Sequence, residues 1–129
     1  MRKPLFTGCC TALVTPFENG KVNFTMLETL LARQINAGIK AVVICGTTGE
    51  SPTLSDTEKL AIFRHAKAYA GNNCTIIAGT GSNCTEHAAA LSRAAESRGA
   101  DPHTFQYDRI SSPSSRPLLF TLQKIYIEH

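Results

Sequence analysis

The stretch from residue 45 to residue 51 carries the side chains best suited to chemistry. It reads Cys-Gly-Thr-Thr-Gly-Glu-Ser, so the hydroxyls of Thr47 and Thr48 stand between two glycines. Gly46 and Gly49 allow a sharp turn with positive φ, which lets backbone N–H groups approach a ligand. The alternative is an ordinary turn between a strand and a helix, where Gly and Thr are also common, and the local pattern leaves both open.

Two other chemistries are weaker fits to the same loops. A phosphate site is disfavoured, because residues 46–51 lack the Walker lysine and the Gly-Thr-Gly at 79–81 lacks the third Rossmann glycine. Cys84 and His87 are one helical turn apart and could share a metal ion, but the sequence offers no second ligand pair. We therefore expect neither a metal nor a cofactor.

Composition places the chain among globular proteins. Of its 129 residues, 43% are apolar and 18% are charged. The net charge is only +3, and the Lys and Arg residues are scattered among acidic ones, so we expect no nucleic-acid partner. No run of about 18 apolar residues predicts a membrane span, and no signal peptide is evident at the start. Five cysteines, an odd number without a Cys-x-x-Cys pair, fit a reducing cytoplasm better than a disulfide framework.

The elements that must position the loop repeat along the chain. Apolar runs at 9–14, 41–44 and 75–78 predict strands, and each is followed by a stretch with helical spacing of apolar residues. The helices have start signals: Asn23, then the capping box Ser55-x-x-Glu58, then Thr85 or Asn83. Such units, about 30 residues long, predict a parallel sheet whose strands are covered on both faces. The carboxyl ends of such strands are where α/β folds place their chemistry.

The character of the sequence changes after Asp101. Residues 102–116 are rich in Pro and Ser and show neither a strand nor a helix period. The apolar stretches at 118–122 and 125–127 are only a weak signal for a short strand or helix. We therefore predict one domain region over 1–101 and an irregular tail over 102–129.

Three motifs together resemble the pyruvate-dependent class I aldolase and lyase family of TIM barrels. They are Thr-Ala-Leu-Val-Thr-Pro-Phe at 11–17, Gly-Thr-Thr-Gly-Glu at 46–50 and Gly-Thr-Gly-Ser-Asn at 79–83, on three successive strand–helix units. The resemblance implies an α/β fold, a partial (β/α)8 barrel of about three units. The Gly-Thr-Thr-Gly-Glu form looks more like the dipicolinate branch than the sialic-acid lyase branch.

In that branch the resemblance implies a lysine- and diaminopimelate-biosynthesis reaction. Pyruvate forms a Schiff base with an enzyme lysine, its enamine attacks aspartate semialdehyde, and the product cyclises. Thr47 matches the hydroxyl that relays a proton between two tyrosines, and Thr48 matches the residue that holds the pyruvate carboxylate. Glu50 is expected to organise the loop by accepting backbone hydrogen bonds. The resemblance also implies homo-oligomers.

A possible effector site is implied by the same resemblance. Ser51, Asn83 and His87 lie where relatives with lysine feedback place their effector. The glutamate usual there is replaced by His87, which argues against feedback by lysine.

The family also has a tyrosine-rich segment, a later catalytic tyrosine and the Schiff-base lysine. None of the three has a match in this sequence. A substitute lysine must lose its proton near neutral pH and stand at the carboxyl end of a strand. Lys40 falls at the opposite end of its strand and Lys124 in the tail; the others fall on turns or helix faces: Lys3, Lys21, Lys59 and Lys67. We therefore expect the chain by itself to be inactive. The alternatives are a remnant of a 2-keto-3-deoxy sugar-acid aldolase or sialic-acid lyase, or a non-catalytic fragment that self-associates.

Overall fold

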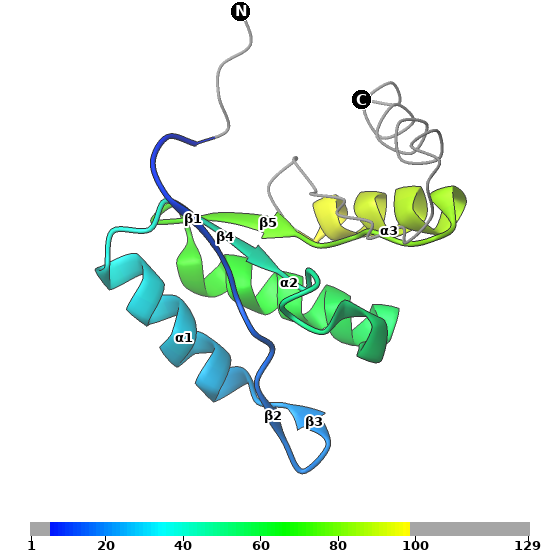
Figure 1. Ribbon diagram of the computed structural model, residues 1–129, viewed down its shortest axis with the longest axis horizontal. Helices are drawn as coiled ribbons and strands as arrows, with labels where there is room; N and C mark the ends of the chain where they lie inside the picture. The colour runs from blue at the N-terminus through cyan, green and yellow to red at the C-terminus, as the bar shows by residue number, and fades with distance from the viewer. Residues whose placement is uncertain (1–5, 99–129) are drawn as a thin grey trace, which may run out of the picture.

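A parallel sheet with helices packed against it forms the described part of the chain, residues 6–98 of the computed structural model (Figure 1). The elements in chain order are β1 (Cys10–Ala12), β2 (Phe17–Glu18), β3 (Lys21–Val22), α1 (Phe24–Asn36), β4 (Ala41–Ile44), the 3-10 turn η1 (Ser51–Thr53), α2 (Asp56–Ala70), β5 (Thr75–Ala78) and α3 (Thr85–Ser97). The predicted tail over 102–129 lies outside the described residues.

The three longer strands form one sheet in the order β1-β4-β5, and both pairings are parallel. Ala41 stands opposite Cys10 on one side and opposite Thr75 on the other. The predicted parallel sheet is confirmed. The first strand is shorter than the predicted 9–14, although the N–H of Leu13 still donates to the carbonyl oxygen of Val43 at 2.9 Å.

A small antiparallel hairpin, β2–β3, separates β1 from α1. Asn19 and Gly20 form its turn with φ 51° and 75°. Two successive positive φ angles match the twist of a two-residue hairpin, and Asn-Gly adopts them at low cost. Asn-Gly is itself a turn signal in the sequence, whereas the two-residue strands beside it are too short to show a strand period.

The first two helices begin where the sequence predicts. The Asn23 side chain accepts a hydrogen bond from the N–H of Met26 at 2.9 Å at the start of α1. At the start of α2, the Ser55 hydroxyl accepts from the N–H of Glu58, and the Glu58 carboxylate accepts from the N–H of Ser55 at 2.8 Å. Each side chain thus satisfies a backbone donor that the helix itself leaves unpaired.

The start of α3 differs from the prediction. Its N-cap is Cys84, which makes no side-chain capping bond, so neither Thr85 nor Asn83 is the cap. The N–H of Cys84 donates instead to the hydroxyl of Ser82 at 3.2 Å. A hydroxyl two residues earlier therefore already fixes the backbone at this position. Gly99, a residue type that commonly ends a helix, lies outside the described residues.

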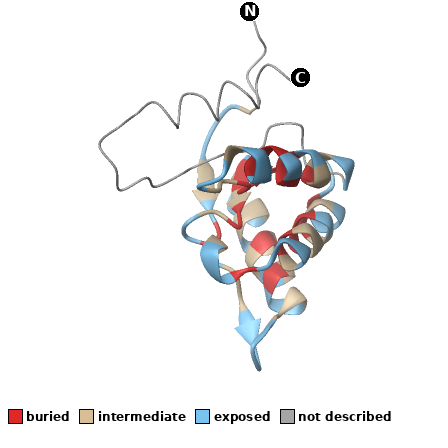
Figure 2. Cartoon of the chain, turned by 90° about the vertical axis from the view of Figure 1, so that its right-hand side faces the viewer, coloured by how far each residue is buried: buried red, intermediate tan, exposed pale blue. Residues whose placement is uncertain are grey.

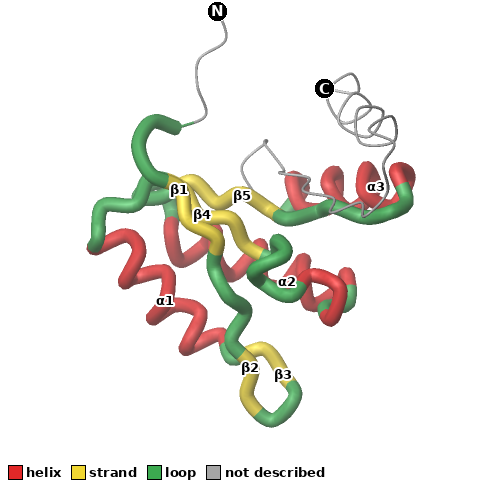
Figure 3. Tube along the Cα trace, in the orientation of Figure 1, coloured by secondary structure: helices red, strands yellow, loops and turns green. Residues whose placement is uncertain are grey.

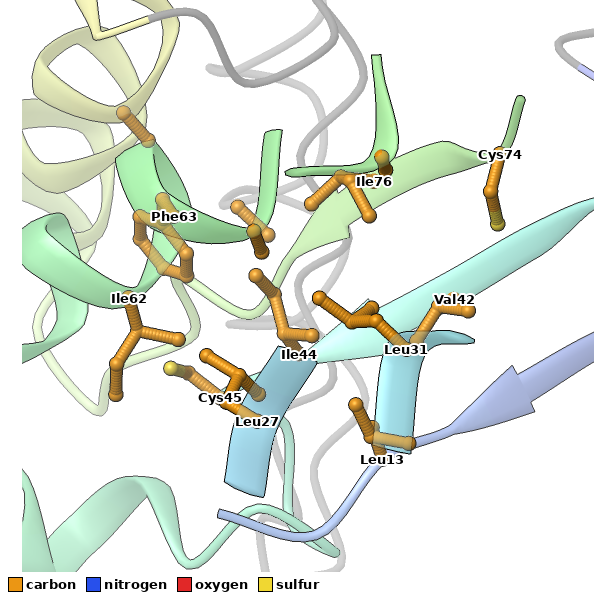
Figure 4. Packing of buried hydrophobic residues seen from close by; sticks show 14 of the residues in the cluster. Leu13, Leu27, Leu31, Val42, Ile44, Cys45, Ile62, Phe63, Cys74 and Ile76 are labelled. Carbon is orange, nitrogen blue, oxygen red and sulfur yellow. The ribbon is translucent and has the colours of Figure 1, made fainter. Parts of the chain in front are cut away.

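The core lies between the sheet and the helices, as the packed side chains in Figure 4 and the central buried positions in Figure 2 show. Val42 and Ile44 point into this core, and Phe63 of α2 is fully buried against it. Successive strand residues face opposite sides, so Val43 points the other way and is only half-buried. The helices of the described region thus cover one face of the sheet, and the predicted cover on the second face is incomplete there.

Candidate functional site

The loops that follow β4 and β5 leave the sheet at the same edge, because the strands are parallel (Figure 3). Together they line a cavity of about 680 Å³. Its lining residues are Ala12, Val43, Cys45, Gly46, Thr47, Thr48, Ser51, Pro52, Lys59, Gly79, Gly81, Ser82, Asn83 and His87. The cavity thus gathers Thr47 and Thr48 with the three residues at the implied effector position.

The glycines of the first loop do not supply its left-handed backbone. The residues with positive φ are Cys45 (53°) and Glu50 (58°), which flank the loop on either side. Gly46 and Gly49 have no positive φ, so this part of the sequence interpretation is wrong. Gly49 is needed for another reason: a Cβ there would lie 3.0 Å from the backbone nitrogen of Cys45.

Close approach also explains the glycine that opens the second loop. A Cβ on Gly79 would lie 2.3 Å from the carbonyl oxygen of Cys45, and no real side chain tolerates that distance. The N–H of Gly79 donates to the carbonyl oxygen of Ile44 at 2.8 Å, which continues the pairing of β4 with β5. The missing side chain therefore lets the two loops run together at the cavity.

Backbone bonds within the first loop fix the hydroxyl-bearing segment. The N–H of Gly49 donates to the carbonyl oxygen of Gly46 at 3.1 Å, and the N–H of Glu50 donates to that of Thr47, also at 3.1 Å. Among the residues that the structure describes, the hydroxyls of Thr47 and Thr48 make no hydrogen bond, and both side chains are exposed. These donors are held in place and remain open to a ligand.

Glu50 organises the loop through its main chain. Its carbonyl oxygen accepts from the N–H of Thr53 at 2.9 Å and from the Thr53 hydroxyl at 2.8 Å, while its side chain is exposed. The left-handed backbone of Glu50 directs the chain into η1. The predicted organising role therefore belongs to the carbonyl oxygen rather than to the carboxylate.

Lys59 is the residue that the sequence interpretation missed. It lies on α2 as predicted, yet its relative exposure is 6% and it lines the cavity. The neighbouring sequence gave no signal that Lys59 is buried, because a lysine one turn into an amphipathic helix usually extends into solvent. Burial raises the pKa of the neighbouring Cys45 thiol to about 12, and the charge of Lys59 opposes that rise.

His87, which lines the cavity, is held by two partners. Its Nε2 lies 2.6 Å from the Asp56 carboxylate and its Nδ1 lies 3.0 Å from the Ser82 hydroxyl. Because a carboxylate only accepts, Nε2–H is the donor to Asp56. Both ring nitrogens are thus engaged, which leaves neither to share a metal ion with Cys84. Residues 6–98 contain no group of three His, Cys, Asp or Glu side chains that could hold one.

The other described lysines lie away from the cavity. Lys40 directly precedes β4, where its N–H donates to the carbonyl oxygen of Cys9, so it stands at the amino end of the strand as predicted. Lys21 is exposed on the hairpin and Lys67 lies in the last turn of α2. Lys3 and Lys124 fall outside the described residues. No helix between residues 6 and 98 has both the length and the apolar content needed to cross a membrane.

Comparison with known proteins gives consistent results. A family model described as "Dihydrodipicolinate synthetase family" matches residues 5–105. A curated relative, the 4-hydroxy-tetrahydrodipicolinate synthase of Acetivibrio thermocellus, is 46% identical over 101 residues, which are 78% of this chain and 35% of the relative. The chain therefore spans about a third of the length of that relative.

Solved structures agree with the sequence match. Dihydrodipicolinate synthase from Acinetobacter baumannii, described as chloride inhibited and complexed with pyruvate, is 35% identical with a TM-score of 0.79 over 93% of this chain and 42% of that one. The enzyme from Cyanidioschyzon merolae with lysine bound is 35% identical with a TM-score of 0.81 over 92% of this chain and 41% of that one. The predicted fold class, a partial TIM barrel, is confirmed. The chain belongs to the dihydrodipicolinate synthetase family and corresponds to its N-terminal part.

Proposed function

We propose that this chain supplies the keto-acid-binding part of a 4-hydroxy-tetrahydrodipicolinate synthase in lysine and diaminopimelate biosynthesis in the cytoplasm. In the complete reaction, the pyruvate carbonyl condenses with a lysine amine and loses water to form an imine. The derived enamine forms a carbon–carbon bond with the aldehyde of aspartate semialdehyde, and the product cyclises. The names of the curated relatives favour this reaction over the sugar-acid aldolase alternative.

The observation that carries the proposal is the pair of free hydroxyls on Thr47 and Thr48, two of the residues that line the cavity. They lie in the loop after the carboxyl end of β4, and no described residue satisfies them. The backbone N–H of Thr48 also makes no bond to the backbone of residues 6–98. A carboxylate needs such converging donors once it leaves water.

Thr48 is the proposed carboxylate-binding residue, through its hydroxyl and its backbone N–H. Neutral donors can hold a carboxylate by directed hydrogen bonds without shifting the pKa of a nearby imine-forming lysine, as a cation in the same place would. Thr47 is the proposed proton-relay hydroxyl, since one O–H group can accept a proton and donate another in the same step.

The 129 residues by themselves are proposed to form no imine with pyruvate. An imine-forming lysine needs a neutral amine within reach of the bound carbonyl. Of the lysines in the described region, only Lys59 lines the cavity, and it stands on a helix rather than at the end of a strand. No described lysine therefore combines burial with a strand-end position.

The test is borohydride trapping of the full chain with labelled pyruvate, with an intact homologous synthase as the positive control. We expect no labelled adduct on this chain and a stable adduct on the homologue. Label on any of the six lysines would contradict the proposal, and Lys59→Arg would show whether Lys59 carries it.

Pyruvate binding tests the role of Thr48 directly. Replacing Thr48 with Val removes the hydroxyl at nearly constant volume and should weaken pyruvate binding by about tenfold, the value of one hydrogen bond to a charged group. Thr57→Val on the exposed face of α2 is the matched control and should leave the affinity unchanged. Equal affinity of the Thr48 variant and the parent chain would refute the assignment.

Self-association is the second candidate. Within residues 6–98, β1 and β5 each pair with β4 alone, so each keeps one edge without a strand partner. Unpaired edges expose N–H and C=O groups that can pair with another chain. Size-exclusion chromatography with light scattering would show a dimer or larger species if this holds and a monomer if it does not.

A further inference from the structure

Lys59 is a buried cation whose charge the described structure leaves uncompensated. It is 94% buried, lines the cavity and comes from the first turns of α2. In residues 6–98 its ammonium group makes neither an ion pair nor a hydrogen bond. A buried ammonium group without a partner is costly, so such a group calls for a counter-charge from a ligand.

The surrounding residues do not provide that counter-charge. The cavity lining contains no Asp or Glu among the described residues. The Cys45 thiol beside Lys59 stays neutral at physiological pH, because burial raises its pKa to about 12. Asp56, at the start of the same helix, is engaged by His87 at 2.6 Å. Lys59 therefore gives the described lining of the cavity a positive charge.

Further donors face the same space. The side chains of Ser51 and Asn83 line the cavity and make no hydrogen bond within the described region. The N-termini of α2 and α3, both near the cavity, add the positive ends of two helix dipoles. Ser82 is different, because it already binds Cys84 and His87.

We propose that a small oxyanion, the carboxylate or phosphate group of a metabolite, binds in this cavity at Lys59, with Ser51 and Asn83 as supporting donors. This subsite is separate from the one proposed for the pyruvate carboxylate at Thr48. It is selective for anions: a free amino acid such as lysine would bring an ammonium group next to Lys59, and no lining residue within 6–98 carries a carboxylate to pair with it.

The test is isothermal titration of the full chain with inorganic phosphate and, separately, with succinate, at constant ionic strength set by chloride. We expect at least one of them to bind, and Lys59→Gln to weaken that binding by at least about tenfold. Lys59→Arg should retain it, because the charge is kept. Lys21→Gln, which removes an exposed lysine on the hairpin, should have no effect. The relative strength of the two probes shows whether the group is a phosphate or a carboxylate.

Thermal unfolding provides a second readout that does not depend on calorimetric heats. The bound anion should raise the midpoint of the parent chain and leave that of Lys59→Gln unchanged. Without anion, the variant should unfold at the same or a higher temperature, because it no longer buries an unpaired charge.

Three results would overturn the proposal: no binding of either probe up to about 10 mM, equal binding by Lys59→Gln and the parent chain, or tighter binding of L-lysine than of succinate. Thr48→Val separates this subsite from the proposed function. The Thr48→Val chain should bind pyruvate more weakly than the parent chain and bind the anion equally well. Weaker binding of both would contradict the separation, because the two subsites would then be one.

Discussion

The Thr15 hydroxyl donates a hydrogen bond of 2.7 Å to the carbonyl oxygen of Gly49 and so ties the segment after β1 to the loop after β4. Gly49 is buried, and its N–H is already used by the carbonyl oxygen of Gly46. One side chain from the first strand–helix unit thus supports the loop of the second unit that presents Thr47 and Thr48.

Removing this hydroxyl should destabilise the loop. Thr15→Val keeps the shape of the side chain but leaves the buried carbonyl oxygen of Gly49 without its partner, at a cost of about 1–3 kcal/mol. Urea unfolding of the two proteins measures the difference. Thr29→Val is the matched control, because the Thr29 hydroxyl bonds to the Thr25 carbonyl oxygen on an exposed helix face. A loss no larger than that of the control would show that the Thr15 bond is unimportant.

Gly79 should be irreplaceable even by alanine. Its Cβ would lie 2.3 Å from the carbonyl oxygen of Cys45, a backbone atom that cannot move without breaking the pairing of β4 with β5. We expect a loss of about 3 kcal/mol or more in the free energy of unfolding, at the upper end for an overpacked core. Gly46→Ala is the comparison: its Cβ would meet only the Val43 side chain, at 3.2 Å, and should cost much less. Similar losses in the two variants would contradict this account.

The capping box of α2 should show in the pH dependence of stability. Hydrogen bonds from the backbone and then the side chain of Ser55 lower the pKa of Glu58 below its ordinary 4.5. A lowered folded-state pKa means that the stabilisation is complete above the ordinary pKa and is lost as the pH falls through the lowered one. Ser55→Ala removes the hydroxyl and keeps the backbone donor, so it should move the Glu58 pKa part of the way back up and make this part of the profile shallower. NMR titration of the Glu58 carboxyl carbon measures the change; an unaltered pKa would rule out the Ser55 hydroxyl as a cause of the shift.

The five thiols should differ sharply in reactivity. Cys9 and Cys84 are exposed, whereas Cys45 and Cys74 are buried. Only the thiolate reacts, and a pKa of about 12 leaves Cys45 almost fully protonated at pH 8. Iodoacetamide followed by mass spectrometry should therefore label Cys9 and Cys84 in the native chain, and Cys45 only after denaturation.

Cys10 is the intermediate case. It is half-buried, and burial followed by the charge of Cys9 raises its pKa, so its labelling should be slower than that of Cys9. Rapid labelling of native Cys45 would contradict its placement in the core. A Cys45→Ala chain would confirm which labelled peptide is which.

Local signals in the sequence were sufficient for the three parallel strands, the helices that follow them and two of the three helix starts, but not for the short strands β2 and β3. Asn23 and the Ser55–Glu58 pair act on N–H groups two or three residues away, so their effect is written in adjacent positions. Continuous apolar runs predicted the parallel strands, because this signal also lies in adjacent positions of the sequence. The start of α3 was predicted wrongly, because Ser82, just outside the expected cap, had already taken the N–H of Cys84.

The sequence by itself determined that three strand–helix units would bring the Thr47–Thr48 loop and the loop at 79–83 to one end of a parallel sheet. Only the tertiary structure decided how these loops meet. Three features depend on groups far apart in the chain: the 2.3 Å that would separate a Cβ on Gly79 from the carbonyl oxygen of Cys45, the hydrogen bond from Thr15 to Gly49, and the burial of Lys59. Periodicity reports which face of an element is apolar. It does not report which atoms of another element lie opposite, and that contact decides whether a lysine meets water or the wall of a cavity.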